Sequence, residues 1–133
     1  MATAQGVIDR AGGILGIVSS PGAAVDATTS AAMLTVLQDF ISEMGERGAL
    51  EIPAPPAVGT TLDVSPGTIR GLAYNLAYDY AETIGRDLGR TATQIAMQTK
   101  SRMIARSTVS REVNFGADGL GVSHSRYNIN TDA

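Results

Sequence analysis

The pattern of apolar and polar positions predicts two amphipathic helices in the first 48 residues. Apolar side chains recur every three or four positions along Thr3–Leu15 and again from Asp26 to about Gly45, which is the spacing of one helix face. A Ser-Ser-Pro-Gly turn separates the two stretches. The second stretch has polar candidates for an N-terminal cap and a glycine stop, and acidic residues fill its other face. Its expected core stripe is Met33, Leu34, Val36, Leu37, Phe40, Ile41 and Met44.

Two more helices are predicted between residues 65 and 110. Ser65 followed by Pro66 marks the start of the third, because proline is favoured at the first helical position. The fourth begins at Thr91 or Thr93 and ends between residues 106 and 110, with a thin apolar face and a basic remainder. In the third helix, Asp79 and Glu82 are expected to point outward. The expected core face of the third helix is Ile69, Leu72, Ala73, Leu76, Tyr80 and Ile84.

Two stretches break the helical pattern. Residues 48–66 are rich in proline and glycine, and they form either a loop or a short β-arm whose pairing a PAPP run would interrupt. Residues 111–133 contain three glycines together with aromatic and branched aliphatic side chains, which are depleted in purely solvated tails. The chain is therefore predicted to be all-α: a small bundle of three to four helices at 1–110 with an inserted loop, and an extended C-terminal docking arm at 111–133.

The composition predicts a core of small side chains. The chain has 133 residues, of which 44% are apolar but only 5% aromatic, and it has no tryptophan. Alanine, leucine, isoleucine, valine and methionine bury limited area per residue, so an isolated monomer is expected to be modestly stable. Association with other copies would add buried area.

Charge is distributed unevenly along the chain. Residues 1–85 contain three basic and nine acidic residues, a balance of −6, whereas residues 86–133 contain seven basic and four acidic residues, a balance of +3. Such a chain can stack against copies of itself or bridge two differently charged partners. The simpler alternative is that the charged residues only form solvated helix faces.

The residues do not support a catalytic, metal or cofactor site. Cysteine is absent, and the single histidine, His124, lies between two serines in the predicted arm, where the geometry of an activated nucleophile is not held. The glycine-rich run at 116–121 lacks the strand and helix that flank a phosphate-binding loop. No apolar run is long enough to span a membrane, and we expect no signal peptide, catalytic residue, metal ion or cofactor.

The basic fourth helix is the strongest candidate for a binding surface. Arg102, Arg106 and Arg111 are suited either to nucleic-acid phosphates or to carboxylates on a protein surface. An acidic isoelectric point of about 5.0 and the lack of interleaved aromatic residues favour a protein partner. A small DNA-binding packaging factor that uses this helix is the alternative.

Four sequence patterns resemble the head–tail adaptor (head-completion, or tail accessory factor) proteins of tailed bacteriophages. They are an N-terminal helix ending in ILGI at Ile14–Ile17, an acidic helix finishing MGERG at Met44–Gly48, the helix GLAYNLAYDY at Gly71–Tyr80, and a C-terminus ending RYNINTD at Arg126–Asp132. The similarity spans nearly the whole chain. This chain is short, so the additional activities of larger relatives do not carry over.

The resemblance implies a structural virion protein, not an enzyme, assembled in the bacterial host cytoplasm. Such proteins form a ring, typically of twelve copies, beneath the portal protein, and their C-terminal arms climb along the portal and neighbouring subunits. The body of the ring presents a platform for tail proteins of the nozzle, tube or fibre-adaptor kind. Packaged DNA passes through the channel, and the ring helps to retain it.

The residues and the resemblance together give a set of expected partner contacts. Aromatic and aliphatic anchors in the arm would fill partner pockets, and arginines would pair with acidic surfaces on the portal or the adjacent subunit. The expected partner-binding residues are Arg102, Arg106, Arg111, Phe115, Arg126, Tyr127 and Ile129.

Overall fold

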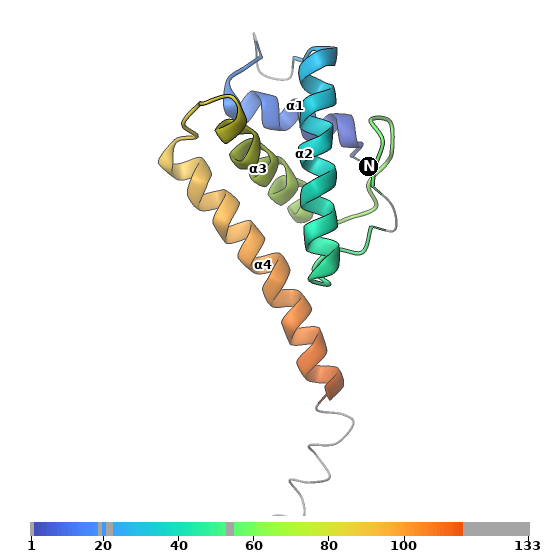
Figure 1. The fold of residues 1–133 in the computed structure, drawn as a ribbon. Helices are drawn as coiled ribbons and strands as arrows, with labels where there is room; N and C mark the ends of the chain where they lie inside the picture. The colour runs from blue at the N-terminus through green and yellow to red at the C-terminus, as the bar shows by residue number, and fades with distance from the viewer. Residues whose placement is uncertain (1, 19, 21–22, 53–54, 116–133) are drawn as a thin grey trace, which may run out of the picture.

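A computed structural model places four helices in a small bundle (Figure 1). It describes residues 2–18, 20, 23–52 and 55–115, and the side chains of these residues up to Arg106. Within this part of the chain no strand forms, so the predicted all-α class is confirmed. None of the helices in these ranges is both long and apolar enough to cross a bilayer.

Helix α1 spans Ala4–Leu15, so it begins one residue after the predicted start at Thr3 and ends at the predicted residue. Thr3 caps its start, because the Thr3 hydroxyl accepts a hydrogen bond from the Gly6 amide at 3.1 Å. Gly16 ends it in the left-handed conformation with φ of 70°, which a residue without a Cβ adopts readily. The Arg86 guanidinium also donates to the Leu15 carbonyl at 2.8 Å, which ties this helix end to the segment before the last helix.

Helix α2 spans Ala27–Glu46 and lies along the front of the molecule in Figure 1. Asp26 caps it by accepting a hydrogen bond from the Thr29 amide at 3.1 Å. Hydrogen bonds from Thr29 hold the pKa of Asp26 below its ordinary value, as expected for a carboxylate at a helix start. The predicted core stripe of α2 is largely confirmed, although Leu34 and Val36 are only partly buried. The buried apolar residues of this helix are Met33, Leu37, Phe40, Ile41 and Met44.

Helix α3 spans Pro66–Thr83 and is the central element, since it packs against all three other helices. Ser65 caps it as predicted, with its hydroxyl accepting from the Thr68 amide at 3.3 Å. The predicted core position of Ile84 is wrong: the helix ends at Thr83, and Ile84 is 38% exposed. The outward placement of Asp79 is also wrong, because this side chain is half-buried and burial raises its pKa.

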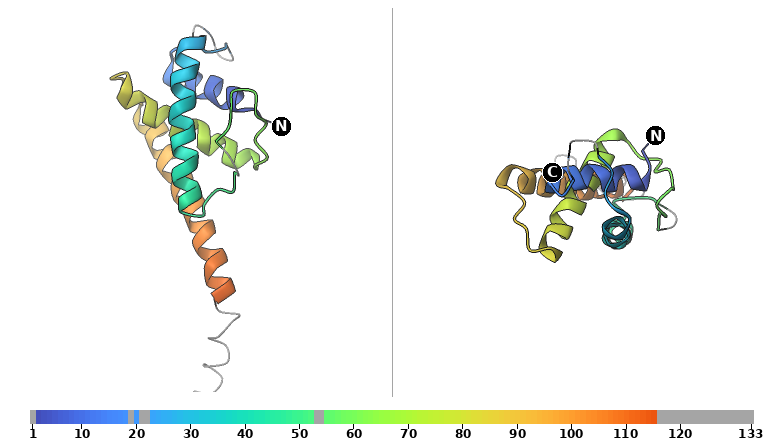
Figure 2. Two further views of the ribbon diagram at one scale, coloured as in Figure 1. Left: turned by 45° about the vertical axis from the view of Figure 1, so that its right-hand side comes forward. Right: turned by 90° about the horizontal axis from the view of Figure 1, so that it is seen from above.

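Helix α4 spans Arg90–Phe115 and is longer than the sequence predicts. Residues 111–115, which we assigned to the extended arm, continue the helix, and the remainder of the predicted arm lies outside the described residues. The first turns of α4 pack on α3, whereas its last turns extend beyond the end of α2 (Figures 1 and 2). The first turns of α4 are therefore part of the bundle, and its last turns extend outside the bundle.

A close approach fixes the register of α3 against α4. A Cβ atom at Gly71 would lie 2.8 Å from the terminal methyl of Met103 and 3.1 Å from the Cβ of Thr99, so only glycine fits without adjustment. The buried Asn75 amide donates to the Gly71 carbonyl at 2.8 Å and to the Thr99 hydroxyl at 3.1 Å. The hydrogen bond to Thr99 crosses from α3 to α4, so it favours one alignment of the two helices.

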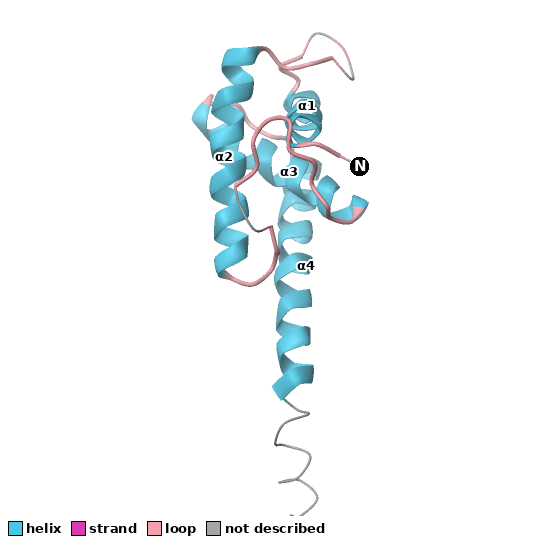
Figure 3. Ribbon diagram, turned by 90° about the vertical axis from the view of Figure 1, so that its right-hand side faces the viewer, coloured by secondary structure: helices cyan, strands magenta, loops and turns pink. Residues whose placement is uncertain are grey.

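The connector between α2 and α3 lies against the start of α1 (Figure 3). The Ala4 amide donates to the Thr60 carbonyl at 2.9 Å, and the Leu62 amide donates to the Ala2 carbonyl at 2.9 Å. Thr3 and Thr61 form one isolated antiparallel bridge. Of the two predicted alternatives, the described residues of this connector form a loop, and they pair with the N-terminal segment instead of forming a hairpin.

Candidate binding surface on helices α3 and α4

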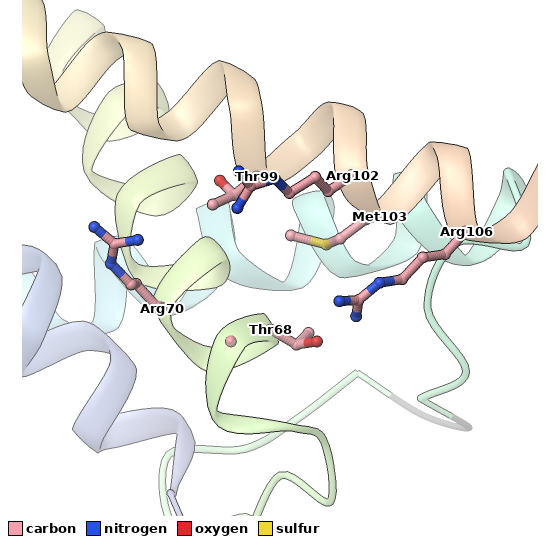
Figure 4. A pocket seen from close by; sticks show the side chains of 7 residues that line it. Thr68, Arg70, Thr99, Arg102, Met103 and Arg106 are labelled. Atoms are coloured by element: carbon pink, nitrogen blue, oxygen red, sulfur yellow. The ribbon is translucent and has the colours of Figure 1, made fainter.

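A hollow of about 100 Å³ lies between the start of α3 and the middle of α4, and three arginines from these two helices are among the residues that line it. In Figure 4 the guanidinium group of Arg106 points toward Thr68, and that of Arg102 lies beside Thr99, whereas that of Arg70 points away from Met103 and Arg106. We call this site the arginine pocket. Its lining residues are Gly67, Thr68, Arg70, Thr99, Arg102, Met103 and Arg106.

The sequence places these side chains together through helical spacing on both elements. Positions 99, 102, 103 and 106 recur at three- and four-residue intervals, so they share one face of α4. Thr68 and Arg70 lie in the first turns of α3, directly after the Ser65 cap. The Arg70 guanidinium lies 5.3 Å from the centre of the Tyr74 ring, one helical turn further on, and this stacking orients it.

The charged side chains that line the arginine pocket are all basic. None of its lining residues is acidic, and within the described residues neither Arg70 nor Arg102 forms an ion pair. The pocket also adjoins the N-terminal end of α3, where the helix dipole adds partial positive charge. The arrangement can attract an anion, and it offers no nucleophile–base pair.

The opposite side of α4 faces acidic residues. Positions 100 and 102 are about 200° apart around a helix, so Lys100 points away from the arginine pocket. Lys100 lies 3.5 Å from a Glu43 carboxylate oxygen, and its ammonium group lies 5.7 Å from the centre of the Phe40 ring. Burial raises the pKa of Asp79 on this side; Lys100 partly opposes the shift, whereas Glu43 and Glu82 add to it.

A second hollow, of about 440 Å³, lies in the α2–α3 connector and has an acidic rim. Glu51 and Asp63 contribute its carboxylates, while Ile52 and Leu62 contribute apolar surface. Within the described residues no group of three histidine, cysteine or acidic side chains comes together to hold a metal ion. The charged residues that line the arginine pocket are therefore basic, whereas those that line the second hollow are acidic.

The structure brings together two of the predicted partner-binding residues, Arg102 and Arg106. The backbone of Arg111 and Phe115 lies in the last turns of α4, while their side chains are outside the described part of the chain. The remaining predicted contacts, Arg126, Tyr127 and Ile129, lie outside the described residues.

Sequence reasoning missed Arg70 as a member of this surface. Its position just after the Ser65-Pro66 helix start was visible, but its proximity to α4 depends on the register that Gly71 and Asn75 impose. No local pattern in the sequence encodes that register.

Comparisons of the chain with protein-family models, with curated proteins and with solved structures give no match. The resemblance to head–tail adaptors therefore stands on the sequence patterns alone.

Proposed function

We propose that this protein is a non-enzymatic head–tail adaptor of a tailed bacteriophage virion, which forms a ring beneath the portal and connects it to the tail. The observation that carries this proposal is the length of α4, whose last turns extend beyond the bundle and lead into residues 116–133. A helix that continues past its own core presents a docking element to another molecule.

The energetics of α4 support a docking role. The helix has 26 residues, which corresponds to a length of about 39 Å. Its buried side chains in the described part are few, with Ala96, Thr99 and Met103 forming a narrow seam against α3. A largely polar helix is only weakly stable by itself, so contacts with a partner would stabilise the turns beyond the bundle.

The placement of charge supports association of copies into a ring. The arginine pocket lies on one side of α4, whereas Glu43, Asp79 and Glu82 lie on the side of Lys100. Two different complementary surfaces on one chain favour head-to-tail contacts, and such contacts close into rings when the rotation between copies allows it. Acidic α2 surfaces facing the channel would let packaged DNA slide, because like charges repel.

Docking is tested by removing the proposed anchors from the arm. Replacing Arg126, Tyr127 and Ile129 together by alanine should weaken binding to portal rings at least tenfold, since aromatic and arginine anchors dominate interface energy. Replacing Asn128 and Asn130 by alanine is the matched control and should leave binding nearly unchanged. Affinity is measured by surface plasmon resonance on immobilised portal rings, and ring formation by negative-stain microscopy. Unchanged affinity of the triple variant would rule out docking through the arm.

A small DNA-binding packaging factor remains the second candidate, and the arginine pocket is the observation that favours it. It predicts binding of duplex DNA that weakens steeply as salt is added, because phosphate contacts release counterions. Fluorescence anisotropy with labelled duplex at increasing salt separates the two candidates. Absence of binding at low salt would exclude the DNA-binding candidate.

A further inference from the structure

The connector between α2 and α3 contains the hollow of about 440 Å³, which docking through the arm does not use. We propose that this connector hollow is a docking site for an extended, basic segment of a partner protein, which lies as an added strand beside Thr61. The lining residues come from two stretches: Glu51, Ile52 and Pro55 from the first, and residues 60–63 from the second. The proposal goes beyond the head–tail assignment and does not depend on it.

Thr61 has a backbone edge that the fold leaves open. It forms an antiparallel bridge with Thr3, and the two hydrogen bonds of this bridge come from the neighbouring residues Thr60 and Leu62. In an antiparallel pair the amide and carbonyl groups of successive residues point alternately to the two sides of the strand, so those of Thr61 point away from the N-terminal segment. Neither group forms a hydrogen bond with another described residue. Thr61 therefore offers one donor and one acceptor to an incoming strand.

The first stretch of the lining is open in the same way. The backbone amides and carbonyls of Glu51 and Ile52 form no hydrogen bond with any described residue. Backbone groups that the protein does not pair take water or a partner instead. Because both stretches line one hollow, an extended segment within it meets unpaired backbone groups from each of them.

The side chains of the connector hollow suit a segment in which basic and aliphatic residues alternate. Glu51 and Asp63 are exposed, and within the described residues neither carboxylate forms an ion pair. Leu62 is buried and Ile52 is half-buried, so these two side chains provide apolar surface. Side chains of an extended segment alternate between two faces, so aliphatic ones can contact this apolar surface while arginine or lysine reaches the carboxylates.

The size and exposure of the connector hollow favour a peptide that crosses it. Its volume of about 440 Å³ lies within the roughly 300–1,000 Å³ typical of ligand sites. Four of its lining residues are nevertheless exposed to solvent, so the hollow does not enclose a ligand. These are Glu51, Thr60, Thr61 and Asp63. A peptide can place some side chains in such an open hollow and leave the rest of its chain outside.

The chain does not itself supply a segment that matches the connector hollow. Residues 116–133 contain one basic and two acidic residues, a balance of −1, so charge does not favour them beside two carboxylates. Most of the other basic residues, such as Arg102 and Arg106, lie within helices, where the backbone groups are already paired. A basic segment of another protein is therefore the occupant that charge complementarity favours.

The test uses the isolated full-length chain, so it does not depend on the portal or on ring assembly. The probe is a short fluorescein-labelled peptide in which arginine and valine alternate, and its anisotropy is expected to show saturable binding at physiological ionic strength. Replacing its arginines by glutamine, or methylating its backbone nitrogens, should each weaken binding roughly fivefold or more. The first change removes the charge complementarity, and the second removes the backbone hydrogen bonds.

Two double variants locate the site. Glu51→Gln combined with Asp63→Asn should weaken binding roughly fivefold or more, because each exposed charge contributes a modest amount. Glu82→Gln combined with Asp87→Asn removes the same charge from exposed positions beside the turn between α3 and α4, which lies across the bundle from the connector in Figure 1, and should leave the affinity unchanged. The peptide should also slow hydrogen exchange of the Thr61 amide, which contacts through side chains alone would not do.

The outcomes decide both the site and its occupant. Saturable binding that requires the arginines, the free backbone nitrogens and the two carboxylates supports the proposal. Absence of saturable binding, equal weakening by both double variants, or insensitivity to backbone methylation would overturn it. Tighter binding of a peptide with the chain's own residues 116–133 at Thr61 would also overturn it, because the occupant would then be a second copy. All of these measurements are made without portal rings, so docking of the arm to the portal is judged separately.

Discussion

Helices α1, α2 and α3 form a dense apolar body, whereas α4 packs on α3 with few buried side chains in its described part, namely Ala96, Thr99 and Met103. The largest fully buried apolar side chains of the described residues all come from the body or its connector: Val7, Ile8, Met33, Leu37, Met44, Pro56, Leu72 and Leu76. In the described part of α4, Met97 is 55% exposed. The seam of α4 uses small and polar side chains and brings arginines to the surface. Stability thus resides mainly in one region, and the candidate binding surface in the other.

Truncating a core residue of the body should have the largest effect and tests this division most simply. Leu76→Ala is expected to lower the free energy of unfolding by about 2–5 kcal/mol, because the side chain is fully buried and leaves a cavity. Met97→Ala on α4 should change it by less than about 0.5 kcal/mol. Urea unfolding followed by circular dichroism measures both. Equal losses from the two variants would show that α4 contributes as much apolar packing as the body.

Removing the buried amide between the two regions should have the next largest effect. Asn75→Ala is expected to cost about 1–3 kcal/mol, since it removes hydrogen bonds to Gly71 and Thr99 inside the seam. The loss should be concentrated in α4, which depends on this seam for its register. Hydrogen exchange should therefore accelerate in α4 more than in α1. A uniform acceleration across all helices would contradict a special role for Asn75.

Removing the tie between α1 and the segment before α4 should cost less. Arg86→Ala is expected to lower stability by about 1–2 kcal/mol, because a partly buried carbonyl at Leu15 loses a charged donor. Arg90→Ala is the control, since Arg90 is exposed at the start of the next helix. Thermal unfolding of both variants measures the difference. If the two midpoints shift equally, the bond between Arg86 and Leu15 is not a stabilising contact.

The half-buried Asp79 should give the smallest effect and a definite pH dependence. Burial raises its pKa in the folded protein, so the folded state binds the proton more tightly than the unfolded state. Stability contributed by this group is present at low pH and is lost as pH rises from the unfolded value of 3.8 through the raised folded pKa. Asp79→Asn should flatten this dependence and stabilise the protein at pH 7. The gain should be only about half a kcal/mol, because solvent screens a partly exposed carboxylate.

Unfolding measured between pH 3 and pH 8 checks this prediction. Glu82→Gln on the same helix is the control, since Glu82 is exposed. A loss of stability at pH 7 in Asp79→Asn would mean that the attraction to Lys100 outweighs the cost of burial.

Capping chemistry made the helices predictable from the sequence. Ser65 followed by Pro66 marks a helix start through a local hydrogen bond and a fixed proline dihedral angle, and α3 begins at Pro66. For the second helix the sequence offered several polar cap candidates, of which the structure uses Asp26. The end of α4 was placed too early although a signal was present. Neither glycine nor proline occurs between Gly89 and Gly116, and a helix without a breaker has no local reason to stop.

Contacts between helices were harder to predict. The burial of Asp79 and the position of Arg70 depend on how α3 lies against its neighbours, and that alignment is set by Gly71 meeting Met103. Helical periodicity assigns residues to faces of one helix but does not say which face of another helix lies opposite. The arginine pocket is a product of that pairing, so two of its arginines were named from the sequence and the third was not.

The central claim is that the turns of α4 beyond the bundle serve as a docking element. Hydrogen–deuterium exchange of residues 107–115, measured on the free chain and on the chain bound to portal rings, tests it directly. We predict fast exchange of these amides in the free protein, where the last turns of α4 extend beyond the end of α2, and at least tenfold slower exchange in the complex. The same exchange rate in both states, with binding confirmed, would contradict the claim.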